Sequence, residues 1–243
     1  MKHLFTRVGR EILRERIKQA PLLGFDFDGT LAPIVDNPIR AEMRTRTRAL
    51  LHKVAARFCC VVLSGRSRQD VGRRLEGIPL WEVFGNHGLE PWHDSEALVE
   101  RVKEWKTRLT SLTDRPGVWI EDKEYSLSIH YRSCANPNLF RREILEALVR
   151  LKEARIVSGK FVYNVLPDGL VNKGTAFGEA MRRCQRETAL YVGDDHTDED
   201  VFTCCDSARV LSIHVGREPT SRAAYYLRHQ EEIDELLAVI AGT

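Results

Sequence analysis

The stretch LLGFDFDGTLAP, residues 22–33, decides the fold of this 243-residue chain. Its first four residues are apolar and predict a strand buried on both faces, as in parallel sheets. Asp26 and Asp28 follow, and side chains two residues apart on a strand point the same way. Two crowded carboxylates cost free energy unless a cation or a proton relieves their repulsion, so the pair indicates a site. The alternative is an acidic turn in which aspartate serves only as a turn former.

Strand and helix patterns alternate on both sides of this stretch. Periodic stretches predict helices at 41–57, 69–75 and 173–186. Apolar runs predict strands at 59–63, 81–84 and 190–192. This alternation is typical of a doubly wound, Rossmann-like parallel sheet, whose ligands lie at the carboxyl ends of the strands. We therefore expect Asp26, Ser64 and Asn86, which follow three of the strands, on one edge of the sheet.

The middle of the chain has a different character. The segment SLSIHYR, residues 126–132, alternates polar and apolar residues, which is the sign of a half-exposed antiparallel strand. The order helix, hairpin, helix, hairpin predicts helices on one face of an antiparallel sheet. The fold class is accordingly α/β, with a core domain of residues 1–88 and 167–243 and an inserted α+β cap domain of residues 89–166.

Two polar residues at predicted helix starts fit phosphate binding. Ser64 and Gly65 end a strand just before a helix, where a hydroxyl and backbone N–H groups can hold a phosphate. The alternative for Ser64 is a plain N-cap serine. Lys173 opens a helix and can hold a negative nucleophile and a phosphoryl oxygen together. Its alternative is an exposed lysine in the first turn, which the helix dipole slightly disfavours.

The densest acidic cluster, GDDHTDED at residues 193–200, follows another predicted strand. It can be a capped helix start or a solvated face. It also matches a Mg²⁺ site, because Mg²⁺ prefers a few carboxylates together with waters.

Together, these four motifs resemble those of the haloacid dehalogenase superfamily of phosphotransferases. The resemblance implies that Asp26 is the nucleophile and Asp28 the general acid/base, which suits an aspartyl-phosphate route. It implies that Ser64 and Lys173 bind the transferring phosphoryl group. The metal would be Mg²⁺, bound by Asp26, Asp194 and the backbone carbonyl of Asp28, with Asp198 as a supporting acid of the site.

Several stretches are similar to one branch of that superfamily, the trehalose-6-phosphate phosphatases. They are DFDGTLAPIVDNP, LSGRSRQDV, GNHGLE, IEDKEYSLSIHYR, LPDGLVNKG and GDDHTDEDVF. This resemblance implies a phosphoric monoester hydrolase of trehalose biosynthesis, whose cap binds the sugar through polar and charged groups. The residues assigned to substrate binding are Arg66, Asn86, His87, Glu121, Lys123 and Arg132. For Glu121 and Lys123 the alternative is an ordinary exposed ion pair beside a hairpin.

One position departs from the branch. Where its members commonly carry a glutamate that contacts the sugar, this chain has Asn164, in VYNVLP. An amide still bonds to hydroxyl groups but brings no charge. Trehalose 6-phosphate and related glycosyl phosphates, such as sucrose 6-phosphate or glucosylglycerol phosphate, therefore both stay open as substrates.

Two other classes of function are alternatives to a phosphatase. A phosphomutase on the same scaffold would return the phosphoryl group to a sugar, and a sugar bisphosphate would activate it. A non-catalytic sensor of sugar phosphates would not need a nucleophile with an acid/base partner, so Asp26, Asp28, Lys173 and Asp194 argue against it.

Composition limits the partners and the compartment. The residues are 43% hydrophobic and 30% charged, with a formal net charge of +2, which is too small to indicate nucleic-acid binding. No apolar run is long enough for a membrane span.

The N-terminal segment has apolar residues at helical spacing, Phe5, Val8, Ile12 and Ile17. They predict an amphipathic helix that packs on its own domain, and a contact with a membrane or a partner is the alternative. The chain has six cysteines and no CxxC pattern, so we expect buried, reduced thiols in a cytoplasmic monomer.

Overall fold

The structure is a computed structural model that describes residues 1–242 apart from 94, 160, 170 and 205. It divides into two compact units, one of Met1–Gly88 with Asn172–Thr243 and the other of Leu89–Val171. Each unit has a sheet of its own. Their predicted roles as a catalytic core and a substrate-specificity cap stay a prediction.

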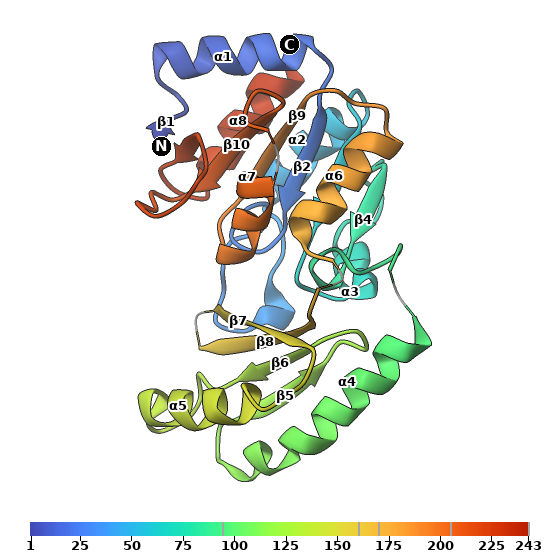
Figure 1. Ribbon diagram of the computed structural model, residues 1–243. Coiled ribbons are helices and arrows are strands. Elements are labelled where there is room, and N and C mark those ends of the chain that lie inside the picture. The colour runs from blue at the N-terminus through green and yellow to red at the C-terminus, as the bar shows by residue number, and fades with distance from the viewer. Residues whose placement is uncertain (94, 160, 170, 205, 243) are drawn as a thin grey trace. The chain divides into compact units, whose positions relative to one another are not determined.

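The first unit is built on a seven-stranded sheet in which every neighbouring pair is parallel, as predicted (Figure 1). In spatial order the strands are β1 (Lys2–His3), β11 (Tyr225–Leu227), β10 (Val210–Val215), β9 (Ala189–Gly193), β2 (Leu22–Asp26), β3 (Cys60–Leu63) and β4 (Glu82–Phe84). Every residue of β2 is buried, because β9 and β3 flank it and helices cover both faces. The register pairs Asp26 with Leu63, so Ser64 follows β3 directly beside the end of β2.

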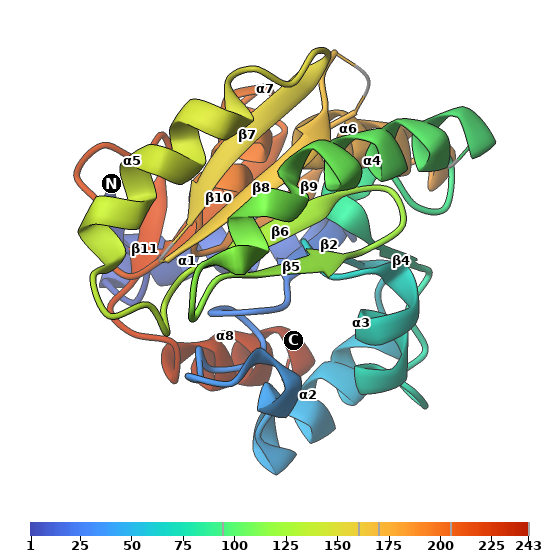
Figure 2. The same cartoon turned by 90° about the horizontal axis from the view of Figure 1, so that it is seen from below.

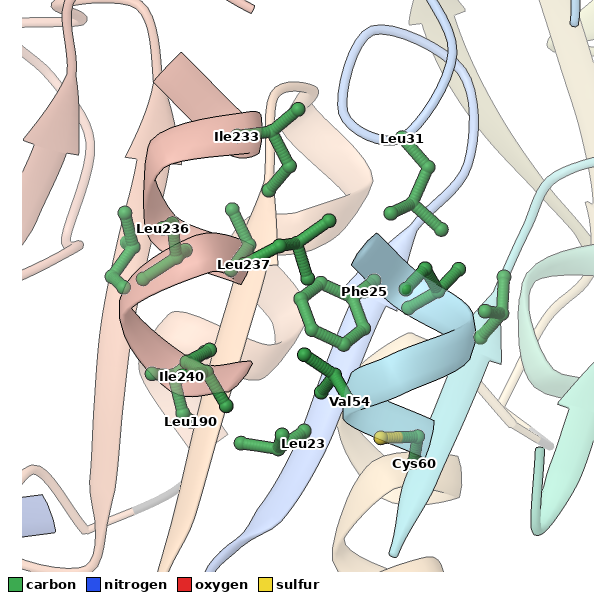
Figure 3. Packing of buried hydrophobic residues seen from close by; sticks show 14 of the residues in the cluster. Leu23, Phe25, Leu31, Val54, Cys60, Leu190, Ile233, Leu236, Leu237 and Ile240 are labelled. Atoms are coloured by element: carbon green, nitrogen blue, oxygen red, sulfur yellow. The ribbon is translucent and has the colours of Figure 1, made fainter. Parts of the chain in front are cut away.

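Helices cover the two faces of this sheet. On one face a single apolar cluster joins Leu23 and Phe25 of β2 to four helices. These are α1 (Arg7–Lys18), α2 (Thr45–Ala55), α3 (Arg68–Arg74) and α8 (Glu232–Ala241). Figure 3 shows members of the cluster from α2 and α8 together with Leu23 and Phe25. Gly24, between the two, points to the other face, where a Cβ would clash with Phe177 of α6 (Lys173–Arg183). The remaining helix of this unit, α7 (Glu199–Cys204), packs against α6 on that face.

The N-terminal helix forms, but its packing face differs from the prediction. Leu13 and Ile17 are buried, whereas Val8 and Ile12 are exposed, so the prediction was wrong for those two. The reason is a spacing of four that begins at Gly9, which lies so close to the Leu4 carbonyl that no Cβ fits there. No helix among the described residues has the length and apolar character to cross a membrane.

The second unit is a four-stranded antiparallel sheet with two helices on one face (Figure 2). Its spatial order is β5 (Trp119–Asp122), β6 (Leu127–His130), β8 (Val162–Pro167) and β7 (Ala154–Gly159). The helices are α4 (Glu96–Leu109) and α5 (Pro137–Leu148), whose apolar sides cover one sheet face. The alternation in SLSIHYR is thereby explained, since Leu127 and Ile129 point into this core.

The cysteines correct the expectation of uniformly buried thiols. Cys60 and Cys134 are buried, but Cys59 and Cys184 are only partly buried and Cys204 is exposed. The remaining one, Cys205, lies outside the described residues. Cys59 precedes β3 and Cys204 is the last residue of α7, so neither lies inside a buried strand, although both belong to apolar stretches of the sequence.

Candidate active site

Lys173 joins two acidic residues at the carboxyl end of β2. Its Nζ donates to Asp26 Oδ1 at 2.7 Å and to Asp198 Oδ1 at 2.8 Å, and all three side chains are almost fully buried. Asp26 is the last residue of β2, and Lys173 is the first of α6. The helix starts there because Asn172 and Thr175 form a reciprocal capping box. The cap therefore determines where the lysine enters the site.

Asp198 is held by four hydrogen-bond donors. Its Oδ1 accepts from Lys173 and from the Tyr191 hydroxyl at 2.7 Å, and its Oδ2 accepts from the backbone N–H groups of Asp194 and Asp195 at 3.1 and 3.0 Å. A Cβ at Gly193 would lie 2.2 Å from the Asp198 carboxyl carbon, so only glycine leaves room for this arrangement. Asp198 thus fixes the lysine and the backbone of the acidic loop at once.

Burial dominates the electrostatics of the cluster. It raises the pKa of Asp26 to about 8, with a further rise from Asp198 and an opposing effect of Lys173. Burial and the carboxylates of Asp26 and Asp198 also raise the pKa of Asp194 well above its usual range. Burial lowers the pKa of Lys173, but its two carboxylate partners outweigh that effect and raise it overall. One ammonium does not neutralise three carboxylates, so the site favours an added proton or cation.

The arrangement of the acids fits a divalent cation. Asp26, Asp194 and Asp198 each present a carboxylate oxygen, and these oxygens lie within 4.8 Å of one another. Among the described residues, Asp194 Oδ1 is a buried oxygen that accepts no hydrogen bond. Gly29, at φ +81°, lets the turn after Asp28 pass close to this carboxylate, since a Cβ there would be 2.0 Å from Asp194 Oδ2. A buried, unpaired carboxylate oxygen beside two further carboxylates is a suitable ligand set for Mg²⁺.

The other acids of the 193–200 stretch have separate tasks. Asp195 caps the short 3₁₀ turn His196–Asp198 by accepting from the His196 N–H at 2.6 Å. Glu199 Oε2 accepts from the backbone N–H of Arg222 at 2.9 Å. The stretch therefore serves both as a capped turn and as part of the acidic cluster.

Asp28 lies beyond the strand and is bound by Arg66. Both Asp28 oxygens accept from the guanidinium, at 2.7 Å each, and the carboxylate is 39% exposed against 6% for Asp26. Arg66 also donates to Asp70 at 2.7 Å and lies over the Phe27 ring. This bidentate pair is a contact that sequence reasoning missed, because Asp28 and Arg66 are 38 residues apart.

The loop after β3 brings Ser64, Asn86 and His87 together. Buried Ser64 donates its N–H to Phe84, and its backbone carbonyl accepts from the His87 N–H at 2.9 Å. Asn86 donates its N–H to the Arg66 carbonyl at 2.7 Å. Asn86 and His87 both have left-handed backbones, at φ 49° and 57°, which non-glycine residues rarely adopt and which often mark functional sites.

In the second unit, a row of polar side chains crosses the sheet. The register pairs Glu121 with Ser128 and Ser128 with Asn164, so the three share one face. Ser128 Oγ donates to Asn164 Oδ1 at 2.6 Å. His130 Nε2 lies 2.9 Å from Glu121 Oε2 and the ring stacks on Trp119 at 3.9 Å between centroids. Ser128, His130 and Trp119 were missed, although the alternation of residues 126–132 already places Ser128 and His130 on this face.

The two other predicted residues of this unit lie nearby in sequence but are placed differently. Lys123, in the turn after β5, has its Nζ 3.9 Å from Glu121 Oε2. Arg132 is exposed just after β6 and lies over the Phe161 ring at 5.5 Å. The predicted site residues therefore form two groups. One group belongs to the first unit: Asp26, Asp28, Ser64, Arg66, Asn86, His87, Lys173, Asp194 and Asp198. The other belongs to the second: Glu121, Lys123, Arg132 and Asn164.

Comparison with known proteins identifies the family. The family described as trehalose-phosphatase matches residues 24–230, which include every residue of both groups. This chain belongs to the trehalose-phosphatase family. It is 31% identical to the trehalose-phosphate phosphatase of Mycobacterium avium and 30% identical to the probable trehalose-phosphate phosphatase 2 of Oryza sativa subsp. japonica.

The extent of these matches differs between relatives. Each of the two matches covers 90% of this chain. The match covers 58% of the length of the mycobacterial protein and 68% of the length of the rice protein. The chain thus spans little more than half the length of the mycobacterial relative. Among solved structures, the C-terminal domain of Candida albicans trehalose-6-phosphate phosphatase has a TM-score of 0.78 at 23% identity and covers 96% of this chain and 97% of its own. That likeness shows a shared fold.

Proposed function

We propose that this chain is a Mg²⁺-dependent phosphatase that hydrolyses trehalose 6-phosphate to trehalose and phosphate. The observation that carries the proposal is the buried contact of Lys173 with Asp26 and Asp198, beside the unpaired oxygen of Asp194, in a member of the trehalose-phosphatase family. Pure binding of a sugar phosphate does not need a buried aspartate oriented by a lysine. Nucleophilic catalysis does.

In the first half of the proposed reaction, an Asp26 carboxylate oxygen attacks phosphorus and the bond from phosphorus to the sugar oxygen breaks. Asp28 donates a proton to that sugar oxygen, so trehalose leaves as a neutral alcohol. Lys173 orients Asp26 through the 2.7 Å hydrogen bond. Ser64, beside the end of β2, would donate a hydrogen bond from its hydroxyl group to a phosphoryl oxygen.

In the second half, water attacks the aspartyl phosphate on Asp26. Asp28, now a carboxylate, takes the proton from that water, phosphate leaves, and Asp26 is regenerated. Arg66 holds both oxygens of Asp28 in this structure, so Asp28 must give up at least one of these bonds in order to transfer a proton. We propose that the sugar phosphate competes with Asp28 for Arg66, which accounts for the predicted substrate contact of this arginine.

The acidic residues of the first unit supply the ligands proposed for Mg²⁺. Asp26, Asp194 and the backbone carbonyl of Asp28 would hold Mg²⁺, with Asp198 supporting them. Bound there, the cation would neutralise charge on the phosphoryl oxygens that approach Asp26. Lys173 supplies one positive charge beside the carboxylates of Asp26 and Asp198, and burial raises the pKa of Asp26 in spite of it, so a cation bound there would favour the ionised carboxylate.

The sugar specificity is assigned to the polar face of the second unit. Glu121, Lys123 and Asn164 offer one carboxylate, one ammonium and one amide, a set that suits a neutral, hydroxyl-rich ligand. The amide oxygen of Asn164 accepts from Ser128 at 2.6 Å, and the side chain offers the amide nitrogen as a donor but no negative charge. This pairing supports a second candidate, a phosphatase for a related glycosyl phosphate.

The test is phosphate release with Mg²⁺ from trehalose 6-phosphate, sucrose 6-phosphate, glucosylglycerol phosphate and glucose 6-phosphate. We expect a preference of at least about tenfold in kcat/KM for trehalose 6-phosphate, corresponding to about 1.4 kcal/mol of differential binding. The Asp26→Asn variant is the blank. A preference for another member of the panel would support the second candidate, and absence of release from all four would overturn the phosphatase proposal.

A further inference from the structure

Cys59 and Cys184 bring their sulfur atoms to 2.9 Å although the residues are 125 positions apart in the chain. Both are free cysteines and both are partly exposed. We infer that they form a modification site, which a hydroperoxide converts into an intramolecular disulfide. The inference does not depend on the proposed phosphatase activity.

The fold aims the two thiols at each other. Cys59 directly precedes β3, and the next residue, Cys60, points into the apolar cluster beside Val54 (Figure 3). Because successive residues of an extended chain face opposite sides, Cys59 points to the other face, which α6 covers. Cys184 is the residue that ends α6. The fold therefore places two thiols that are far apart in the sequence next to each other in space.

Secondary structure holds both backbones in place. The Cys59 carbonyl accepts from the Leu23 N–H of β2 at 2.9 Å, and the Cys184 N–H donates to the Ala180 carbonyl at 2.8 Å. A disulfide bond is about 2.05 Å long, so the sulfurs have to approach by only about 0.9 Å. We expect side-chain rotation to supply this movement.

The chemistry balances with one hydrogen peroxide. The Cys59 sulfur attacks one peroxide oxygen, the O–O bond breaks, and Cys59 becomes a sulfenic acid while the first water leaves. The Cys184 sulfur then displaces the sulfenic oxygen, which departs with the thiol proton as the second water. Two thiols are oxidised and the peroxide is reduced. Burial and the adjacent Cys59 raise the pKa of Cys184, which fits its role as the second, resolving thiol.

The cross-link lies at the opposite end of α6 from the catalytic lysine. Lys173 is the first residue of this 11-residue helix and Cys184 is its C-cap, so the two ends are roughly 16 Å apart at 1.5 Å per residue. The bond would join positions 125 residues apart and restrict the unfolded chain, which stabilises the folded state. We therefore expect the disulfide to raise thermal stability and leave the catalytic end of the helix unchanged.

The experiment treats the full chain with hydrogen peroxide and maps its peptides without reduction. The expected result is a Cys59–Cys184 peptide pair about 2 Da lighter than the sum of the two thiol peptides. Dithiothreitol should remove the bond and lower Tm by roughly 5–15 °C. Because the mapping uses the unaltered chain, it stands even where a variant fails to fold.

Matched variants assign the bond. C59S and C184S should each lose both the linked peptide and the Tm difference. C134S, in the second unit, and C60A, on the same peptide as Cys59, should keep both. The inference is overturned if peroxide yields only sulfinic or sulfonic acids, if the link involves another cysteine, or if C59S retains it.

Discussion

The two groups of polar residues differ in how they are held. In the first unit, Asp26, Lys173 and Asp198 come from β2, α6 and a turn after β9, and all three are almost fully buried. In the second unit, Glu121, Ser128 and Asn164 lie in one row across adjacent strands, and the Glu121 side chain is 41% exposed. The first group is fixed by side-chain contacts between a strand, a helix and a turn, whereas the second is aligned by the register of neighbouring strands, which brings Ser128 beside Asn164 across 36 positions.

This difference agrees with the two roles that we propose, the chemical step for the first group and sugar binding for the second. A nucleophile needs one geometry, and burial with several partners supplies it at the cost of a strongly shifted pKa. A sugar-binding face needs a set of donors and acceptors, and a side-chain change on a strand alters that set without disturbing the core of the unit. Changes to the first group should therefore affect every substrate, and changes to the second only those that carry the sugar.

The largest effect is expected at Asp26. Asp26→Asn removes the nucleophile and should lower kcat by at least about 10³-fold, equally for trehalose 6-phosphate and p-nitrophenyl phosphate. Asp114→Asn, an exposed acid in the second unit, is the control and should keep full activity. Activity of Asp26→Asn above about a tenth of the unaltered level, with a native circular dichroism spectrum, would remove Asp26 from its assigned role.

The second prediction compares two ion pairs. Lys173→Met leaves Asp26 and Asp198 buried without their cation, so the free energy of unfolding should fall by about 3–5 kcal/mol. Lys106→Met, which breaks the half-exposed pair with Asp122 in the second unit, should cost less than about 1 kcal/mol. Urea unfolding curves measure both, and equal costs would contradict the contrast between a buried cluster and an exposed pair.

The third prediction concerns pH and the metal. The pKa of Asp26 is about 8 in the folded state against an ordinary value near 4, so between these values the folded state binds more protons. Without divalent cations, stability should therefore fall as pH rises from 5 to 8, by at most about 1.4 kcal/mol per pH unit for this group. The lowered pKa values of Asp70 and Glu232 act mainly below that window.

Added Mg²⁺ should oppose this fall, because a cation binds the ionised carboxylates in preference to the protonated ones. Thermal unfolding in EDTA and in Mg²⁺ at four pH values measures the effect. Stability in EDTA that is flat or rising from pH 5 to 8 would contradict the prediction.

The smallest effect is expected in the second unit. Glu121→Gln keeps the shape but removes the charge, so kcat/KM for trehalose 6-phosphate should fall by about tenfold. For p-nitrophenyl phosphate, which has no sugar, the change should stay below about threefold. Glu104→Gln, on the exposed side of α4, is the matched control. Equal losses on both substrates would place Glu121 outside sugar recognition.

Much of the fold follows from local pattern. The buried run before Asp26 predicted β2, the alternation in 126–132 predicted the antiparallel sheet, and the NKGT segment predicted a helix starting at Lys173. Two short strands, β1 at one edge of the sheet and β11 next to it, were missed, because such short segments carry too little periodicity to be recognised. The wrong packing face of α1 has a different cause, the close approach of Gly9 to the Leu4 carbonyl, which only the tertiary structure shows.

The sequence by itself determined which chemistry-bearing residues this protein has and at which strand ends they stand, because strand, turn and cap signals extend over only a few residues. Only the tertiary structure decided their partners. Lys173 contacts Asp26 across 147 positions, Arg66 binds Asp28 across 38, and Cys59 meets Cys184 across 125. The physical reason is that burial, which sets these contacts and the pKa of Asp26, arises from packing between elements and has no local signature.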